Sequence, residues 1–117
     1  MLPQTVVCYN VFVKLADLIK QAVSVRKLFS KFEKKTYGKE WGNKEIMEGF
    51  IVDTGELMRL VMAKEGLRKE GRVDEKLKHE LADCLWCILI LAQKYNINLE
   101  EAFTQTMIGL KKKLRDK

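Results

Sequence analysis

The sequence predicts an all-α protein, a four-helix bundle, and three observations lead to this fold class. Apolar side chains recur at three- and four-residue spacing along four segments, as on one face of an amphipathic helix. The single proline, Pro3, lies at the N-terminal end, so no later residue removes a helical hydrogen bond in this way. The segments are joined by short connections, which favour antiparallel neighbours.

The first predicted helix spans about residues 9–35, and its opposite face is rich in lysine. The stretch TYGKEWGN, residues 36–43, interrupts the pattern with two glycines and supplies Asn43 as a helix N-cap. A second helix is expected over residues 44–65, before the glycines of GLRKEGRVD. The inward stripes consist of Val11, Phe12, Leu15, Leu18, Ile19, Ala22, Val25 and Phe29 in the first helix, and of Ile46, Phe50, Leu57, Leu60 and Val61 in the second.

The third predicted helix spans about residues 73–95 and is apolar on nearly all sides from Leu81 to Ala92. Asn98 and Glu101 of NINLEEAF then form the pattern of a capping box and begin a fourth helix that ends near residue 114. Because two neighbouring helices cannot cover the third on every side, we expect a homodimer or tetramer to complete the bundle. The stripe of the fourth helix consists of Ala102, Phe103, Met107, Leu110 and Leu114.

Length and composition restrict the class of protein. The 117 residues, 47% of them apolar, are enough for one domain, expected over residues 1–117. The start lacks the pattern of a secretory signal, and the longest apolar run is far shorter than the roughly 20 residues that cross a bilayer. We therefore expect a cytoplasmic protein with no membrane partner. The net charge of +6 suits an anionic partner.

Cysteine occurs three times, as Cys8, Cys84 and Cys87, and the last two enclose Leu85 and Trp86 in CLWC. A redox or metal-binding CxxC would be accompanied by a βαβ pattern or by a second Cys/His pair. Neither is found, so we interpret the cysteines as small core residues in a reducing compartment.

Two pairs of carboxylates lie on helix faces that are otherwise apolar. In the second helix, Asp53 points along the centre of the inward stripe, and Glu56 lies one turn on at its edge. In the third helix, Glu80 and Asp83 of HELAD repeat the three-residue spacing. Burying ionised carboxylates without compensation costs several kcal/mol or more, so basic side chains or metal ions must balance them.

Three kinds of cation could compensate the negative charge of these carboxylates. Lys64 and Lys76 share these faces and could form buried salt bridges, although lysine usually extends its ammonium group to water. A ferritin-like di-iron site needs Glu-x-x-His, whereas the only histidine, His79, directly precedes Glu80. Ligand sets made only of oxygen select hard ions, so Mg²⁺ is the expected occupant, with Mn²⁺ as the second choice.

These motifs carry a resemblance to a known family. DTGEL, followed by LVMAKEG, HELADCLW and NINLEEAF, resembles the MazG-like all-α nucleoside triphosphate pyrophosphohydrolases, whose pattern is ExxE on one helix and ExxD on the next. The likeness runs from about Phe29 to Leu114. It implies a Mg²⁺-dependent enzyme that cleaves an NTP or dNTP between the α and β phosphates, giving a nucleoside monophosphate and pyrophosphate. The implied metal ligands are Asp53, Glu56, Glu80 and Asp83.

Two positions depart from the family pattern. The usual motif reads EExxE, whereas this chain has Val52 and Asp53, so the leading glutamate is absent and the ligand is one methylene shorter. Many relatives carry an asparagine before the last basic residues, where this chain has Leu110 before KKKLR. A non-catalytic or weakly active relative that binds a nucleotide or a partner protein is therefore the alternative function.

Within the implied mechanism, Glu56 is the expected general base, which takes the proton of the attacking water. Lys64, Lys111 and Lys113 lie beside the inward stripes and are the expected phosphate contacts, with solvated surface charge as the simpler interpretation. A nucleic-acid-binding module would account for the +6 charge, but it leaves the inward acids unexplained. We therefore place hydrolysis first and expect no nucleic-acid partner.

Aromatic residues supply the expected contacts to the base. Trp41 precedes the second helix where relatives carry an aromatic residue that contacts the base, and Phe29 and Phe32 could form the pocket wall. Ordinary packing is the alternative for all three. Trp86 is assigned to the core or the subunit interface. His79, four residues before the last acid, is assigned either to a hydrogen bond with a metal ligand or to the surface.

Overall fold

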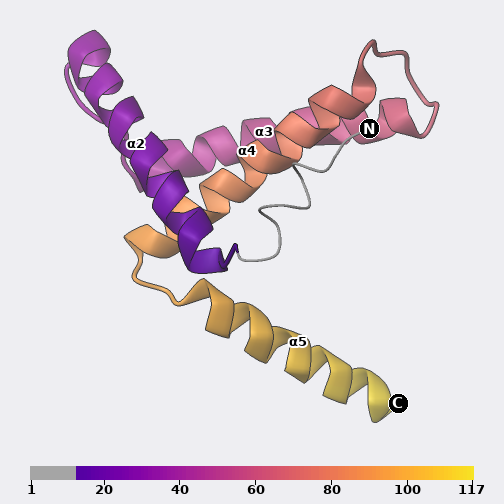
Figure 1. Ribbon diagram of the computed structural model, residues 1–117. Helices are drawn as coiled ribbons and strands as arrows, with labels where there is room; N and C mark the ends of the chain where they lie inside the picture. Colours follow the sequence, from indigo (N-terminus) through magenta and orange to yellow (C-terminus); the bar gives the residue numbers. More distant parts are fainter. Residues whose placement is uncertain (1–12) are drawn as a thin grey trace.

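Four helices and no strand make up the described part of the chain, residues 13–117, in this computed structural model (Figure 1). The helices are α2 (Leu15–Tyr37), α3 (Asn43–Lys64), α4 (Val73–Lys94) and α5 (Leu99–Arg115). The predicted all-α class is confirmed. Cys8, Val11 and Phe12 lie outside the described residues. Within residues 13–117, no helix is both long and apolar enough to cross a membrane.

Helix α2 begins later and ends later than predicted. The N-cap is Lys14 in an extended conformation, and its N–H donates to Oδ2 of Asp17 at 3.1 Å. This local hydrogen bond satisfies a free donor of the first turn, so the predicted start at residue 9 is wrong at least for residues 13 and 14. At the other end, Gly38 adopts φ 84°, and its N–H donates to Lys34 O at 3.0 Å. Left-handed backbone favours glycine, so the helix continues to Tyr37 instead of stopping at the predicted loop.

The other helix ends lie within a residue or two of the prediction. Gly42, not Asn43, is the N-cap of α3, because the Glu45 side chain turns back and accepts the Gly42 N–H at 2.7 Å. Asn98 caps α5 as predicted, and its Oδ1 accepts the Glu101 N–H at 3.1 Å. These side-chain contacts fix where each helix starts.

The core lies where α4 packs between α3 and α2. Ala22 of α2, Ile46 of α3 and Ile90 of α4 belong to one buried cluster, together with Cys87 and Leu89 of α4. Ile90 is fully buried, and Leu60 of α3 is 1% exposed. Neighbouring helices α3 and α4 run alongside each other over most of their length (Figure 1). This pairing places the inward face of α3 opposite α4.

Helix α5 differs from the other three because it contains no buried residue. It extends away from them (Figure 1), and the stripe predicted to face a core is open to solvent. Phe103 is 62% exposed and Leu114 69% exposed, and only Met107 of that stripe is partly covered. The prediction that this stripe is buried is therefore wrong within one chain, because the connection after α4 directs α5 away from α2 and α3.

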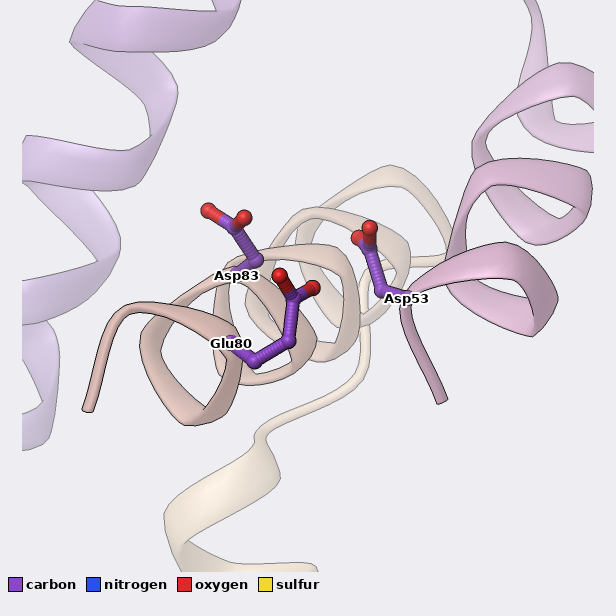
Figure 2. Close-up of side chains that lie close together, drawn as sticks. All are labelled: Asp53, Glu80 and Asp83. Atoms are coloured by element: carbon purple, nitrogen blue, oxygen red, sulfur yellow. The ribbon is translucent and has the colours of Figure 1, made fainter. Parts of the chain in front are cut away.

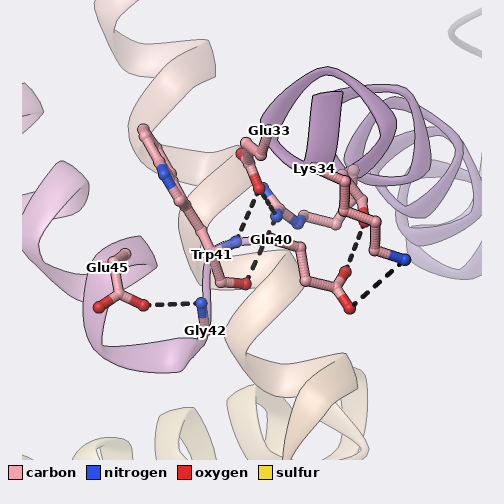
Figure 3. A network of polar contacts seen from close by, with 8 residues as sticks. Glu33, Lys34, Glu40, Trp41, Gly42 and Glu45 are labelled. Atoms are coloured by element: carbon pink, nitrogen blue, oxygen red, sulfur yellow. Dashed lines mark hydrogen bonds and ion pairs between the residues drawn. The ribbon is translucent and has the colours of Figure 1, made fainter. Parts of the chain in front are cut away.

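A buried ion pair holds the connection between α2 and α3. Arg26 and Glu33 face each other on α2, with Nη1 of Arg26 3.0 Å from Oε2 of Glu33. Glu33 is 1% exposed and also accepts the Trp41 N–H at 2.8 Å (Figure 3). Burial alone would raise the pKa of Glu33, but the bonds from Arg26 and Trp41 hold that pKa below its ordinary value. The carboxylate therefore stays ionised inside the fold.

Candidate active site

Three of the four predicted acids converge between α3 and α4. Asp53 extends from α3, and Glu80 and Asp83 extend from successive turns of α4 (Figure 2). One carboxylate oxygen from each lies within 4.8 Å of the others. The three-residue spacing on α4 places both side chains on the face that meets α3. The arrangement can hold one metal ion with oxygen ligands.

This acid cluster, Asp53, Glu80 and Asp83, lacks a neutralising lysine or arginine contact among the described residues. Oε1 of Glu80 is buried and has no hydrogen-bond partner in this part of the chain. Burial, together with repulsion from Asp83, raises the pKa of Glu80 and of Asp53 above their ordinary values. An unpaired buried oxygen among mutually repelling acids fits a cation, because a cation would satisfy the oxygen and relieve the repulsion.

His79 reaches the acid cluster from the solvent side. Its Nε2 lies 3.1 Å from Oδ2 of Asp83, forming an ion pair when the imidazole is protonated. His79 therefore contacts Asp83, one of the four acids predicted to bind metal, although the His79 side chain is largely exposed. A partner of this kind orients a metal-binding carboxylate.

Glu56 stands apart from the acid cluster. Its Oε2 accepts a hydrogen bond from Nη2 of Arg59 at 2.7 Å, and its side chain is 48% exposed. The charge of Glu56 contributes to the raised pKa of Glu80, after burial and the two cluster aspartates, so the two glutamates still interact. The structure thus brings together Asp53, Glu80 and Asp83 and leaves Glu56 paired to Arg59.

An aromatic depression of about 490 Å³ adjoins the acid cluster. Val25 and Phe29 of α2 and Trp86 of α4 line it, together with Asp53 and Asp83. The Phe29 and Trp86 rings lie 5.8 Å apart, and Trp86 Nε1 donates to Ala22 O at 3.1 Å. Phe29, a predicted wall of the base pocket, thus lies in the lining of this depression. Trp86, assigned from the sequence to the core or an interface, also lines the depression.

Neither of the other two predicted aromatic residues lines this depression. Trp41 lies in the connection before α3, where the Glu33 carboxylate accepts its backbone N–H (Figure 3). Phe32 packs edge-on against Tyr37 at 6.2 Å on the exposed side of α2. The sequence offered a signal for Trp86 instead, because it follows Asp83 by three residues and so shares its helix face.

The three predicted lysine contacts lie elsewhere. Lys64 pairs with Asp74 at 2.5 Å, and Lys111 and Lys113 are on α5, which extends away from the other three helices (Figure 1). Lys76 pairs with Glu70 rather than with the cluster, so the alternative of buried salt bridges from Lys64 and Lys76 is wrong. Three cations line one depression together with Glu80. The sequence analysis did not single out two of them, Arg59 and Arg72, and considered the third, Lys76, only as a salt-bridge partner.

Both described cysteines are buried and free, as predicted for core residues. The Cys87 thiol donates to Oδ2 of Asp53 at 3.8 Å. Burial and the Asp53 charge raise the pKa of Cys87 to about 11, so it stays protonated at neutral pH. A protonated thiol is neither a nucleophile nor a thiolate ligand, which argues against a redox CxxC.

Comparison with known families supports the resemblance drawn from the motifs. The family model described as the MazG nucleotide pyrophosphohydrolase domain matches residues 42–116, which include α3, α4, α5 and the whole acid cluster. No curated protein and no solved structure shows significant similarity to the chain.

Proposed function

The chain belongs to the MazG nucleotide pyrophosphohydrolase family, and from this premise we propose that it is a Mg²⁺-dependent nucleoside triphosphate pyrophosphohydrolase. It would cleave an NTP or dNTP between the α and β phosphates, giving a nucleoside monophosphate and pyrophosphate. The observation that carries the proposal is the acid cluster on α3 and α4, in which a buried oxygen of Glu80 has no hydrogen-bond partner among the described residues.

The choice of metal follows from the donor atoms. Asp53, Glu80 and Asp83 offer only carboxylate oxygens, and the Cys87 thiol beside them stays protonated. Oxygen donors favour hard divalent cations, so Mg²⁺ is proposed and Mn²⁺ is the second choice. When bound, the ion would neutralise phosphate charge and polarise the α-phosphoryl group.

Residues of the chain would bind the cation, orient its ligands and accept the proton of the attacking water. The three cluster acids hold the cation, and His79 orients the Asp83 carboxylate. We retain Glu56 as the proposed general base and fourth ligand, because it lies one helical turn from Asp53 and reaches solvent water. Its turn toward the cluster requires release from Arg59.

The aromatic depression is the proposed site for the nucleobase. Phe29 and Trp86 present ring surface directly beside Asp53 and Asp83, so a base there would lie close to phosphates held at the acid cluster. Trp41 remains a proposed second contact to the base. Val25 and Ala82 complete an apolar wall that excludes water from one side of the substrate.

We also propose that the functional unit is a homodimer or tetramer in which α2 belongs to the same domain as the matched helices. Ala22 of α2 shares a core with Ile46 and Ile90, which supports one domain.

The open apolar stripe of α5, and Leu81 and Leu85 on α4, support association. Light scattering that gives the 13.6 kDa mass of one chain would contradict it. Lys111 and Lys113 would contact phosphate only across such an assembly.

The decisive experiment is a nucleotide panel assayed for pyrophosphate release with Mg²⁺ and with chelator. The proposal expects pyrophosphate from at least one NTP or dNTP, and none in chelator. Nucleotide binding without release would instead favour the weakly active alternative, for which the absence of a glutamate at Val52 is the reason. Restoring that residue by Val52→Glu would then raise turnover.

A further inference from the structure

A second depression also borders the acid cluster. It has a volume of about 260 Å³, and Glu80 and His79 lie on its wall, while His79 also borders the aromatic depression. The rest of its lining is mainly charged and comes from both ends of the α3–α4 connection: Arg59, Leu60, Arg72, Glu75 and Lys76. The acid cluster therefore has an aromatic surface on one side and a cationic surface on the other.

Arg59 and Lys76 are joined in one row of ion pairs. Nη2 of Arg59 bonds to Glu56, Nη1 of Arg59 bonds to Glu70, and Lys76 bonds to the other oxygen of Glu70. Glu70 is the best-covered member, with a side chain 16% exposed. A guanidinium group has five N–H donors and an ammonium group has three, so both cations keep donors for a second anion. Residues so anchored lose little freedom when a ligand binds.

Resting on the proposed function, we propose that Arg59 and Lys76 form the subsite for the β and γ phosphates, the part of the substrate that leaves as pyrophosphate. A nucleoside triphosphate carries its base and its terminal phosphates at opposite ends. With the base in the depression lined by Phe29 and Trp86 and the α phosphate at the acid cluster, the remaining phosphates extend past Glu80 toward these cations. Lys64, Lys111 and Lys113 do not line this depression.

The pairing of Glu56 with Arg59 links this subsite to the metal. If Glu56 turns to the cation, Nη2 of Arg59 loses its carboxylate partner while Nη1 stays on Glu70. The freed nitrogen then faces phosphate that the same cation holds. Arginine and phosphate form strong charge-assisted bonds, so phosphate replaces Glu56 as the partner of Arg59. Cation and terminal phosphates should therefore bind cooperatively.

The test uses inorganic pyrophosphate as the probe, titrated calorimetrically into the full chain in Mg²⁺. Arg59→Gln should weaken pyrophosphate binding about tenfold, and Lys76→Gln should weaken it severalfold. Lys64→Gln is the matched control, because it removes one lysine charge from an exposed ion pair on α3 outside the depression. It should bind pyrophosphate like the wild type. Binding of the nucleoside monophosphate product should be unchanged in all three variants.

Glu70→Gln separates a phosphate contact from a purely structural role. It breaks the Arg59–Glu70 pair, as Arg59→Gln does, but it removes a negative charge and keeps both cations, so pyrophosphate should bind at least as tightly as in the wild type. Equal weakening in Glu70→Gln and Arg59→Gln would mean that Arg59 acts only through the fold, and would overturn the proposal. Arg59→Lys, which keeps the charge, serves if the glutamine variant does not fold, and should weaken binding to an intermediate extent.

The subsite and the proposed function can fail separately. Wild-type affinity for pyrophosphate in both Arg59→Gln and Lys76→Gln would overturn the subsite even if the enzyme hydrolyses triphosphates. Conversely, Arg59-dependent pyrophosphate binding without hydrolysis of any triphosphate would support the subsite and reject the proposed function. In an active enzyme, Arg59→Gln should raise KM for the triphosphate, whereas Lys64→Gln should not.

Discussion

Glu33 on α2 and Glu80 on α4 both place carboxylate oxygen in the interior of the fold, but within residues 13–117 only Glu33 forms an ion pair with a cation. Arg26 and the Trp41 N–H satisfy Glu33 and, against the effect of burial, hold its pKa low. Oε1 of Glu80 has no hydrogen-bond partner within residues 13–117, and burial and repulsion from its two acidic neighbours raise its pKa. Burial is therefore common to both regions, and the partner decides the sign of the shift.

The presence or absence of a paired cation distinguishes Glu33, a structural carboxylate, from Glu80, a carboxylate suited to bind a cation. A buried pair whose charges satisfy each other needs nothing further and holds the α2–α3 connection in place. A buried cluster of one sign destabilises the fold until a counterion arrives. Four predictions test this contrast.

Removing a cluster acid should have the largest effect. Asp83→Asn keeps the side-chain shape and deletes one ligand charge, so hydrolysis should fall by roughly 10³-fold, about 4 kcal/mol in the activation barrier. The metal-free protein should melt at the same temperature or higher, because repulsion with Asp53 and Glu80 is relieved. Asp74→Asn makes the same change at an exposed acid and should leave turnover intact. Wild-type turnover in Asp83→Asn would remove Asp83 from the site.

The matching change in the buried Arg26–Glu33 pair should destabilise the fold instead. Glu33→Gln leaves Arg26 buried without its counter-charge, which should cost about 3 kcal/mol of unfolding free energy, the lower end of the usual range because glutamine still accepts a hydrogen bond. Urea denaturation measures this loss. Glu40→Gln, at an exposed acid of the same connection, should change stability by less than about 0.5 kcal/mol. Equal losses in the two variants would contradict the structural role of Glu33.

Metal should stabilise the fold through the acid cluster alone. At a Mg²⁺ concentration tenfold above its Kd, binding adds about 1.4 kcal/mol to the unfolding free energy, because the unfolded chain has no assembled site. Thermal melts with Mg²⁺ and with chelator detect this as a raised Tm. The shift should persist in Glu40→Gln and vanish in Asp83→Asn. A Tm that is unchanged by millimolar Mg²⁺, with and without nucleotide, would count against the acid cluster as a metal site.

The smallest expected effect is on how stability changes with pH, and it has opposite signs at the acid cluster and at Glu33. The raised pKa values of Asp53 and Glu80 mean that the folded chain binds their protons first, so metal-free protein should gain stability as pH falls from 7 through those values. The lowered pKa of Glu33 means that the unfolded chain binds that proton first, so stability should fall below the ordinary glutamate value of 4.5.

Melting temperatures of the wild type and Glu80→Gln between pH 7 and 3, without metal, separate these two contributions. Glu80→Gln should lose much of the initial gain and keep the later fall. A gain of the same size in both proteins would mean that the acid cluster is not its source.

Periodicity alone was enough to predict the helices and the convergence of Asp53, Glu80 and Asp83. A residue every 100° fixes which side chains share a helix face, so the three-residue spacing of HELAD and the apolar stripe around Asp53 placed these acids at the contact between α3 and α4. The family resemblance on the same residues agrees with the match over residues 42–116. The cap at Asn98 was equally readable, since capping depends on neighbours in the sequence.

The packing of distant segments determines which charges meet across turns and helices. Arg59 meets Glu70 eleven residues away, and Glu33 meets the Trp41 backbone eight residues away, because each connection folds back on the helix before it. Because of such contacts, Glu56 pairs with Arg59 outside the acid cluster, and Lys64 and Lys76 pair with acids that do not belong to it. The order of residues along each helix is enough to define its faces, because side-chain direction is a local property of the backbone. The path of the connections determined the partners of those faces, including the open stripe of α5, because such contacts depend on how distant segments pack.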